Sequence, residues 1–135
     1  MKSVNIKGKE YITVNERLIY FRKQAVFKGW RIVEDLIDLN EKEGVFKVSI
    51  VDIDDNIIST AHAQEYRDSS YINKSSFLEN GFTSALGRAL GYLGIGIDTS
   101  IASAEELVNA LNSQNVQKKK STNQFNQNQF KNVKF

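Results

Sequence analysis

The sequence predicts an α+β domain: an N-terminal helix, a three-stranded antiparallel β-meander, a long C-terminal helix, a short helix and a disordered tail. Three Ser/Thr-x-x-Glu capping boxes each precede an apolar run with helical spacing. Three β-rich runs, separated by turn-forming residues, lie between the first two boxes. A chain of 135 residues has the length of a single domain.

The first box, Thr13-Val-Asn-Glu16, predicts a helix from Val14 to Lys28 that stops at Gly29. Its apolar residues recur at helical spacing and are expected to face the core: Val14, Leu18, Phe21 and Ala25. The strands are then expected at Trp30–Leu39, Val45–Ile53 and Ile57–Tyr66. Their connections are short, so sequential hairpins are the simplest topology. A further short strand is possible at Lys9–Ile12.

The second box, Ser76-Phe-Leu-Glu79, precedes a helix over 77–93 whose two faces differ. One face is a predicted core stripe, made by Leu78, Phe82, Leu86, Ala89 and Leu93. The other face is nearly bare and carries Asn80, Ser84, Gly87, Arg88 and Gly91. A glycine inside a helix costs about 1 kcal/mol relative to alanine. The bare face therefore predicts the close approach of another backbone, from a protein or from a nucleic acid.

The third box, Ser103-Ala-Glu-Glu106, predicts a short helix over 104–111. Residues 1–112 form the predicted domain. Residues 113–135 are rich in Gln and Asn, contain five lysines and no acid, and are expected to be disordered. Residues 1–112 then hold 13 basic and 16 acidic residues (18 − 5 and 16 − 0), a net charge of −3. Binding of a polyanion would therefore need a local groove.

Several classes of protein are disfavoured by the residues present. No cysteine is available for disulfides or thiolate chemistry, and no signal segment or membrane-spanning run is found, so a cytoplasmic protein is expected. His62 is the sole histidine and has no visible nucleophile partner. The acids Asp52, Asp54 and Asp55 are typical of a solvated hairpin turn. We therefore predict neither an enzyme nor a cofactor or metal site.

The stretch from Tyr71 to Leu107, which contains TSALGRAL, resembles phage single-stranded DNA-binding and single-strand annealing proteins of the Rad-type annealing fold, the Erf- and Sak-like recombinases. The resemblance implies ATP-independent binding and annealing of single-stranded DNA in phage recombination and replication. It also implies homo-oligomers, rings among them, in the host cytoplasm. Arg88 matches the basic residue that lies in the DNA groove of that family.

The candidate DNA-binding residues are cations interleaved with aromatic rings, a pattern that suits sequence-blind binding of single strands. Arg88 and Lys74 are expected to neutralise phosphates, Tyr66 or Tyr71 to stack on bases, and Gly87 and Gly91 to admit the backbone. Arg31, Lys47 and Arg67 complete the set.

Two alternatives stay open from the sequence alone. One is an OB-like protein that protects single-stranded DNA without annealing it. The other is an oligomeric adaptor that does not bind DNA and uses the bare helix face as its interface. The basic tail is expected to contact DNA, or to dock a replication or recombination partner through its recurring phenylalanines.

Overall fold

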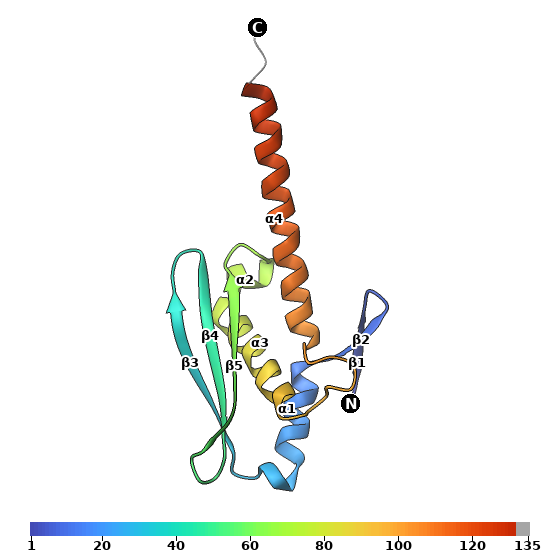
Figure 1. Cartoon of the computed structure of the whole chain (residues 1–135), viewed down its shortest axis with the longest axis vertical. Coiled ribbons are helices and arrows are strands. Elements are labelled where there is room, and N and C mark those ends of the chain that lie inside the picture. Colours follow the sequence, from blue (N-terminus) through green and yellow to red (C-terminus); the bar gives the residue numbers. More distant parts are fainter. Residues whose placement is uncertain (132–135) are drawn as a thin grey trace.

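A computed structural model describes residues 1–131, with side chains through residue 115 and at 118 and 119. Its elements confirm the predicted mixture of helices and an antiparallel sheet (Figure 1). In chain order they are β1 (Ser3–Ile6), β2 (Lys9–Ile12), α1 (Val14–Lys23), the short 3-10 helix η1 (Ala25–Phe27), β3 (Arg31–Leu39), β4 (Glu43–Val51), β5 (Ile57–Tyr66), α2 (Tyr71–Ser75), α3 (Phe77–Tyr92) and α4 (Ala104–Lys131).

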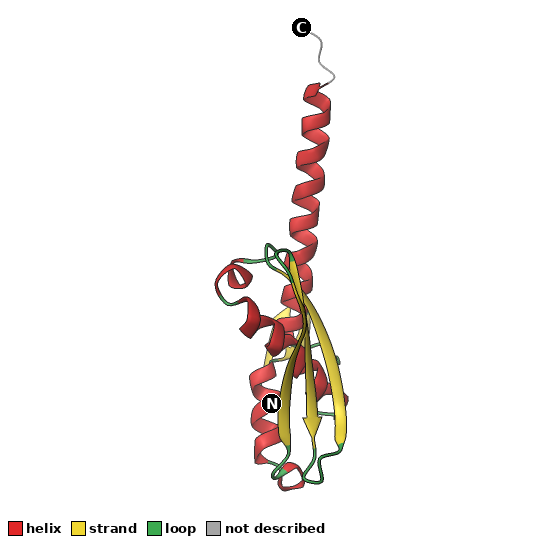
Figure 2. Cartoon of the chain, turned by 90° about the vertical axis from the view of Figure 1, so that its left-hand side faces the viewer, coloured by secondary structure: helices red, strands yellow, loops and turns green. Residues whose placement is uncertain are grey.

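The three long strands form one antiparallel sheet in the order β3-β4-β5, with β4 in the centre. The helices lie on one side of this sheet, and β3 is an outer strand (Figures 1 and 2). Strands β1 and β2 pair only with each other, as a hairpin on the opposite side of the molecule from β3 (Figure 1). The described strands thus form two separate sheets, so the OB-like barrel is wrong.

The core lies between β4 and the helices. The inward side chains of β4 are Phe46, Val48 and Ile50, and all three are completely buried. They pack with apolar residues of α1, β5 and α3, namely Phe21, Ala61, Ala85, Ala89 and Leu90. Strict alternation along β4 explains this burial, because successive side chains of a strand point to opposite faces.

Helix α1 is shorter than the sequence predicted. It ends at Lys23, and Gln24 leaves the helix with an extended backbone. The ring of Phe27 in η1 packs 5.1 Å from Phe21 and 5.0 Å from Trp30. We attribute the early end to this packing, which a continuous helix up to Gly29 would prevent.

In two of the three predicted capping boxes the Ser or Thr side chain caps the helix as expected, whereas the Glu side chain bonds elsewhere: Glu16 accepts from Lys2 N and Glu106 accepts from Arg88. Thr13 Oγ1 accepts from Glu16 N, and Ser103 Oγ accepts from Glu106 N. Ser76 makes no side-chain cap for α3, so that assignment is wrong. Ser70 instead caps the short helix α2, which the sequence did not predict and which occupies the turn just before α3.

The burial of α3 confirms the predicted core stripe only in part. Ala89 is completely buried, and three further members pack partly buried against the core: Phe82, Leu86 and Leu93. Leu78, expected in the core, is 44% exposed. The face that carries small residues is the buried one, with Gly81, Ser84, Gly87 and Gly91 all inside. A Cβ on Gly81 would lie 2.3 Å from the Phe46 ring. The small residues therefore allow α3 to approach the protein's own sheet and helices.

Arg17 of α1 is completely buried at the centre of this close packing. Its Nη1 donates to the carbonyls of Gly87 (2.7 Å) and Ile101 (2.8 Å). Its Nη2 donates to the carbonyls of Gly96 (3.1 Å) and Ser100 (3.0 Å). One guanidinium thus holds α1, α3 and the 94–103 loop together, and burial lowers its pKa.

Helix α4 runs from Ala104 to Lys131 and projects away from the rest of the chain (Figure 1). It contains the helix predicted over 104–111 and continues through most of the segment for which we predicted disorder. Residues 132–135 of that segment, including Phe135, lie outside the described residues.

Replacing Arg17 with methionine is expected to lower the free energy of unfolding by at least about 3 kcal/mol, because buried carbonyls lose their donor at about 1–3 kcal/mol each. Urea denaturation followed by circular dichroism measures this. The control is Arg22→Met, since Arg22 is exposed and, among the described residues, contacts one carbonyl, that of Trp30, and the ring of Phe21. Equal stability of the two variants would contradict the central role of Arg17.

Candidate functional site

Arg88, the leading candidate from the sequence, does not stand alone on a bare helix face. Its Nε and Nη2 donate to Glu106 Oε1 of α4 at 2.9 and 2.6 Å, and its Nη1 donates to the Tyr92 hydroxyl at 3.1 Å. These hydrogen bonds raise the pKa of Arg88, with Glu106 as the main cause. The arginine therefore joins α3 to α4, and the expectation of an unpaired cation is wrong.

Gly87 and Gly91 face the interior of the protein. A Cβ on Gly87 would lie 2.6 Å from Val14 Cγ2 and 3.0 Å from Ser103 Oγ. A Cβ on Gly91 would lie 2.9 Å from Arg17 Nη1. The predicted open track beside these glycines is thus filled by α1 and by the loop before α4. The same packing corrects the adaptor hypothesis, which used this face as an interface between copies.

Arg31 and Lys47 lie apart from the other candidates. Arg31 is at the start of β3 and forms an ion pair with Asp55 of the β4–β5 turn. Lys47 is on the sheet face opposite to the helices, between Asp35 of β3 and His62 of β5. Neither position adjoins Arg88, so the structure does not bring the whole predicted set into one groove.

Four of the predicted residues do come together at one end of the sheet: Tyr66, Arg67, Tyr71 and Lys74. The antiparallel register of β4 and β5 places the β3–β4 turn beside them, since Glu43 pairs with Tyr66. This adds Lys42, which we did not select from the sequence; the register of the hairpin was the available signal. We call these five residues, Lys42, Tyr66, Arg67, Tyr71 and Lys74, the tip cluster.

Arg67 organises the tip cluster. Its backbone N–H donates to the Lys42 carbonyl and its Nε donates to the Asn40 carbonyl, both at 2.9 Å. Its guanidinium carbon lies 4.5 Å from the centre of the Phe77 ring. A depression of about 500 Å³ lies here, lined by Leu39, Asn40, Glu41 and Arg67. The arginine is therefore fixed in position while part of it faces this open depression.

The two tyrosines of the tip cluster differ in exposure. Tyr71, in the first turn of α2, is 85% exposed, and Tyr66, at the end of β5, is 39% exposed. Lys74 is exposed on the last turn of the same short helix. Two accessible rings and three cations thus share one end of the molecule. Three carboxylates, Glu41, Glu43 and Asp68, are also there and balance the three cations, so this end carries no net positive charge.

A buried polar network lies directly beneath the tip cluster. Glu65 of β5 is 3% exposed. Its carboxylate accepts from Asn109 Nδ2 (2.9 Å), Ser84 Oγ (3.2 Å) and Asn73 Nδ2 (3.3 Å). Asn73 Nδ2 also donates to the Tyr66 carbonyl at 2.7 Å. The network therefore fixes α2, and with it Tyr71 and Lys74, relative to the sheet, α3 and α4.

Among the described residues, no cluster of His, Cys, Asp or Glu has the arrangement of a metal site. The Asp52 carboxylate instead accepts from the backbone N–H groups of Asp54 and Asn56, at 2.9 Å each, and so closes the β4–β5 turn. No helix in the described part of the chain is long and apolar enough to span a membrane.

Glu65 should make stability depend on pH. Burial raises its pKa despite three hydrogen bonds that favour the charged form. A raised folded pKa means that the contribution of Glu65 is complete below its unfolded pKa and is lost as pH rises through the folded pKa. Wild type should therefore lose stability relative to Glu65→Gln over that interval. Thermal unfolding of both proteins from pH 4 to pH 8 measures the difference, and a constant difference would contradict it.

Gly87→Ala should destabilise the protein by about 1–3 kcal/mol, because overpacking outweighs the gain of about 1 kcal/mol in helix propensity. Denaturant unfolding tests this. A stabilised variant would mean that the face beside Gly87 is open, as the sequence first indicated.

Comparison with known proteins identifies a family. The family model described as Slr1353 N-terminal dsRNA-binding domain-like matches residues 20–93, from the second half of α1 to the end of α3. Neither the curated proteins nor the solved structures give a match. The resemblance to phage single-strand annealing proteins is therefore corrected by a match to a different family. The matched segment is more than half of the 135 residues, and the chain belongs to the Slr1353 N-terminal dsRNA-binding domain-like family.

Proposed function

We propose that this protein binds nucleic acid without sequence preference, and that the tip cluster is the contact surface. The observation that carries the proposal is that exposed Tyr71 lies at the same end of the sheet as Lys74 and Arg67. The family description, which names a dsRNA-binding-like domain, supports nucleic acid as the ligand class.

The chemistry of the tip cluster favours single strands. An exposed aromatic ring offers a stacking surface to any base, worth about 1–3 kcal/mol per base. Bases of a duplex are already stacked on their neighbours, so Tyr71 gains this contact only with unpaired nucleotides. Lys42 and Lys74 then neutralise flanking phosphates, and Arg67 can donate two hydrogen bonds to one phosphate.

The charge balance predicts modest affinity with a small salt dependence. At most three cations of the tip cluster can displace counterions, and each contributes about −0.7 to the slope of log affinity against log salt for a single strand. Glu41, Glu43 and Asp68 reduce the local potential further. Several copies acting on one strand would be needed for tight binding.

A second candidate is binding of duplex RNA, which the family match favours. Domains of that kind recognise the duplex by its shape, through two successive minor grooves and the phosphates between them. The matched segment contains the second half of α1 and then β3, β4, β5 and α3 in this order, with η1 and α2 between them. On this alternative the exposed tyrosines would contribute little.

We propose binding without catalysis, because the tip cluster has cations and rings and no nucleophile–base pair. Strand annealing, which the sequence first suggested, stays a prediction. It requires single-strand affinity first, and mixing two complementary labelled strands with the protein tests it.

Tyr71→Ala should weaken binding to oligo-dT about 5- to 150-fold, the equivalent of one lost stacking contact of about 1–3 kcal/mol. Lys74→Ala should weaken it less and should reduce the salt slope by about 0.7. Fluorescence anisotropy over a salt series measures both, with oligo-dT, single-stranded RNA, duplex DNA and duplex RNA as ligands.

Matched controls are Tyr20→Ala and Lys28→Ala, since both side chains are exposed and lie away from the tip cluster. Preference for duplex RNA, unaffected by Tyr71→Ala, would support the second candidate. Absence of binding to all four ligands would reject both.

A further inference from the structure

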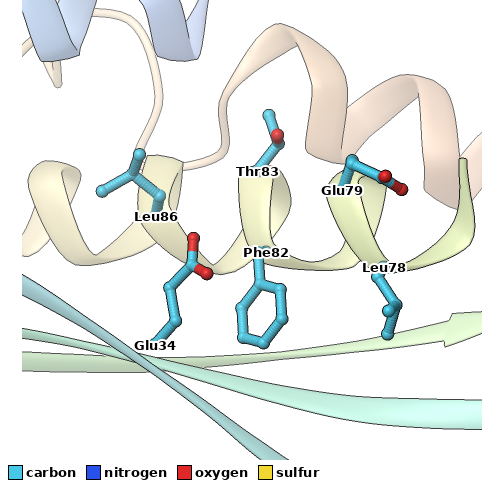
Figure 3. Close-up of a pocket in the computed structure, with 6 residues that line it drawn as sticks. All are labelled: Glu34, Leu78, Glu79, Phe82, Thr83 and Leu86. Carbon is cyan, nitrogen blue, oxygen red and sulfur yellow. The ribbon is translucent and has the colours of Figure 1, made fainter.

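A second surface of the chain is formed by the outer strand of the sheet. Helix α3 packs against β4 and β5, and the inner side of β3 extends beyond it. A groove of about 440 Å³ lies between β3 and α3, lined by Glu34, Leu78, Glu79, Phe82, Thr83 and Leu86 (Figure 3). Leu36, which follows on the same face of β3, is 44% exposed. We call the groove and the free edge of β3 the β3 ledge.

The β3 ledge is apolar in its centre and acidic on its border. Figure 3 shows Phe82 and Leu78 directed toward the strands and Glu34 rising from β3 beside them. Glu79 lies on α3 beside the same groove. Asp35 and Asp38 add negative charge to the same edge strand from the opposite sheet face, where Asp35 is paired in register with Lys47. The nearest cation along β3 is Arg31, which is paired with Asp55. A partner for this surface should therefore be extended, partly apolar and basic.

The β1–β2 hairpin of the chain has these properties. Lys7 and Gly8 form its turn, both with positive φ (51° and 83°). Lys2, Lys7 and Lys9 outnumber its one carboxylate, Glu10, so the hairpin is basic. Val4 is 43% exposed, and both strands are largely solvent-accessible. A lone two-stranded hairpin is marginally stable in water, so it gains from pairing with a further strand.

We propose that the hairpin of one copy of this chain adds to the β3 ledge of the next copy. Before the irregularity between Leu36 and Asp38, β3 offers residues 31–36 in regular register, longer than either four-residue hairpin strand. Main-chain hydrogen bonds at the edge of β3 would supply affinity, and lysine–carboxylate pairs would make the contact specific for the hairpin. Val4 would cover the apolar centre of the ledge.

The same charges exclude the simplest competing arrangement. Pairing of two β3 edges would bring Glu34 and Asp38 of one copy close to the same carboxylates of the other, which is unfavourable. The hairpin and β3 also lie on opposite sides of one molecule (Figure 1). The contact is therefore head-to-tail, and repetition gives a closed ring or an open filament.

Complementary charge reversal tests the contact in the full-length chain. One variant carries Glu34→Lys and Asp38→Lys, and the other carries Lys7→Glu and Lys9→Glu. Sedimentation velocity should show wild type as a species larger than the monomer and each variant alone as monomer. An equimolar mixture should recover the larger species, because each altered edge can then pair with an altered hairpin.

Controls reverse the same number of charges elsewhere, with Asp54→Lys and Asp98→Lys in one protein and Lys23→Glu and Lys28→Glu in another. These should assemble as wild type does, and circular dichroism should show every variant folded. The proposal would be overturned if wild type were monomeric or if the two test variants assembled as wild type does. It would also be overturned if the mixture failed to recover the larger species.

Discussion

The buried guanidinium of Arg17 is the constraint on which the rest of the structure depends. The 94–103 segment between α3 and α4 is irregular, and its carbonyls at Gly96, Ser100 and Ile101 lack the partners that a helix would supply. Arg17 supplies them from one side chain and adds the carbonyl of Gly87. A lysine could not do so, because its ammonium has at most three donors and no planar fork.

Close approach around Arg17 explains why α3 is so poor in large side chains on its inner face. Val14 of α1 and Ser103 of the loop occupy the space beside Gly87, and Arg17 itself occupies the space beside Gly91. Arg88 then fixes the other flank of the helix through Glu106. Arg17 and Arg88 in this region therefore bind other groups of the same chain. The exposed combination of aromatic rings and cations lies instead at the far end of the sheet.

Local patterns were enough to predict much of the fold. The strand over Ile57–Tyr66 has the predicted bounds, and α3 begins at Phe77 as expected, because alternation and helical periodicity are properties of neighbouring residues. The burial of the small-residue face of α3 was not predictable in this way. A stripe of small residues is equally compatible with a ligand and with a neighbouring helix. The position of Arg17 in the fold, against Gly91, shows that the neighbour is α1 of the same chain. Lys42 joins the tip cluster through strand register, which is also a tertiary property.

The short connection between β2 and α1 couples the position of the N-terminal hairpin to the packing of the core. Only Thr13 separates Ile12 from Val14, and its side chain caps α1. Val14 N–H also donates to the Glu105 carboxylate at the start of α4, and Ile12 Cγ2 would lie 3.1 Å from a Cβ on Gly96. Tilting the hairpin would therefore disturb the cap of α1, the start of α4 and the loop around Arg17 together, because Ile12, Thr13 and Val14 contact all three.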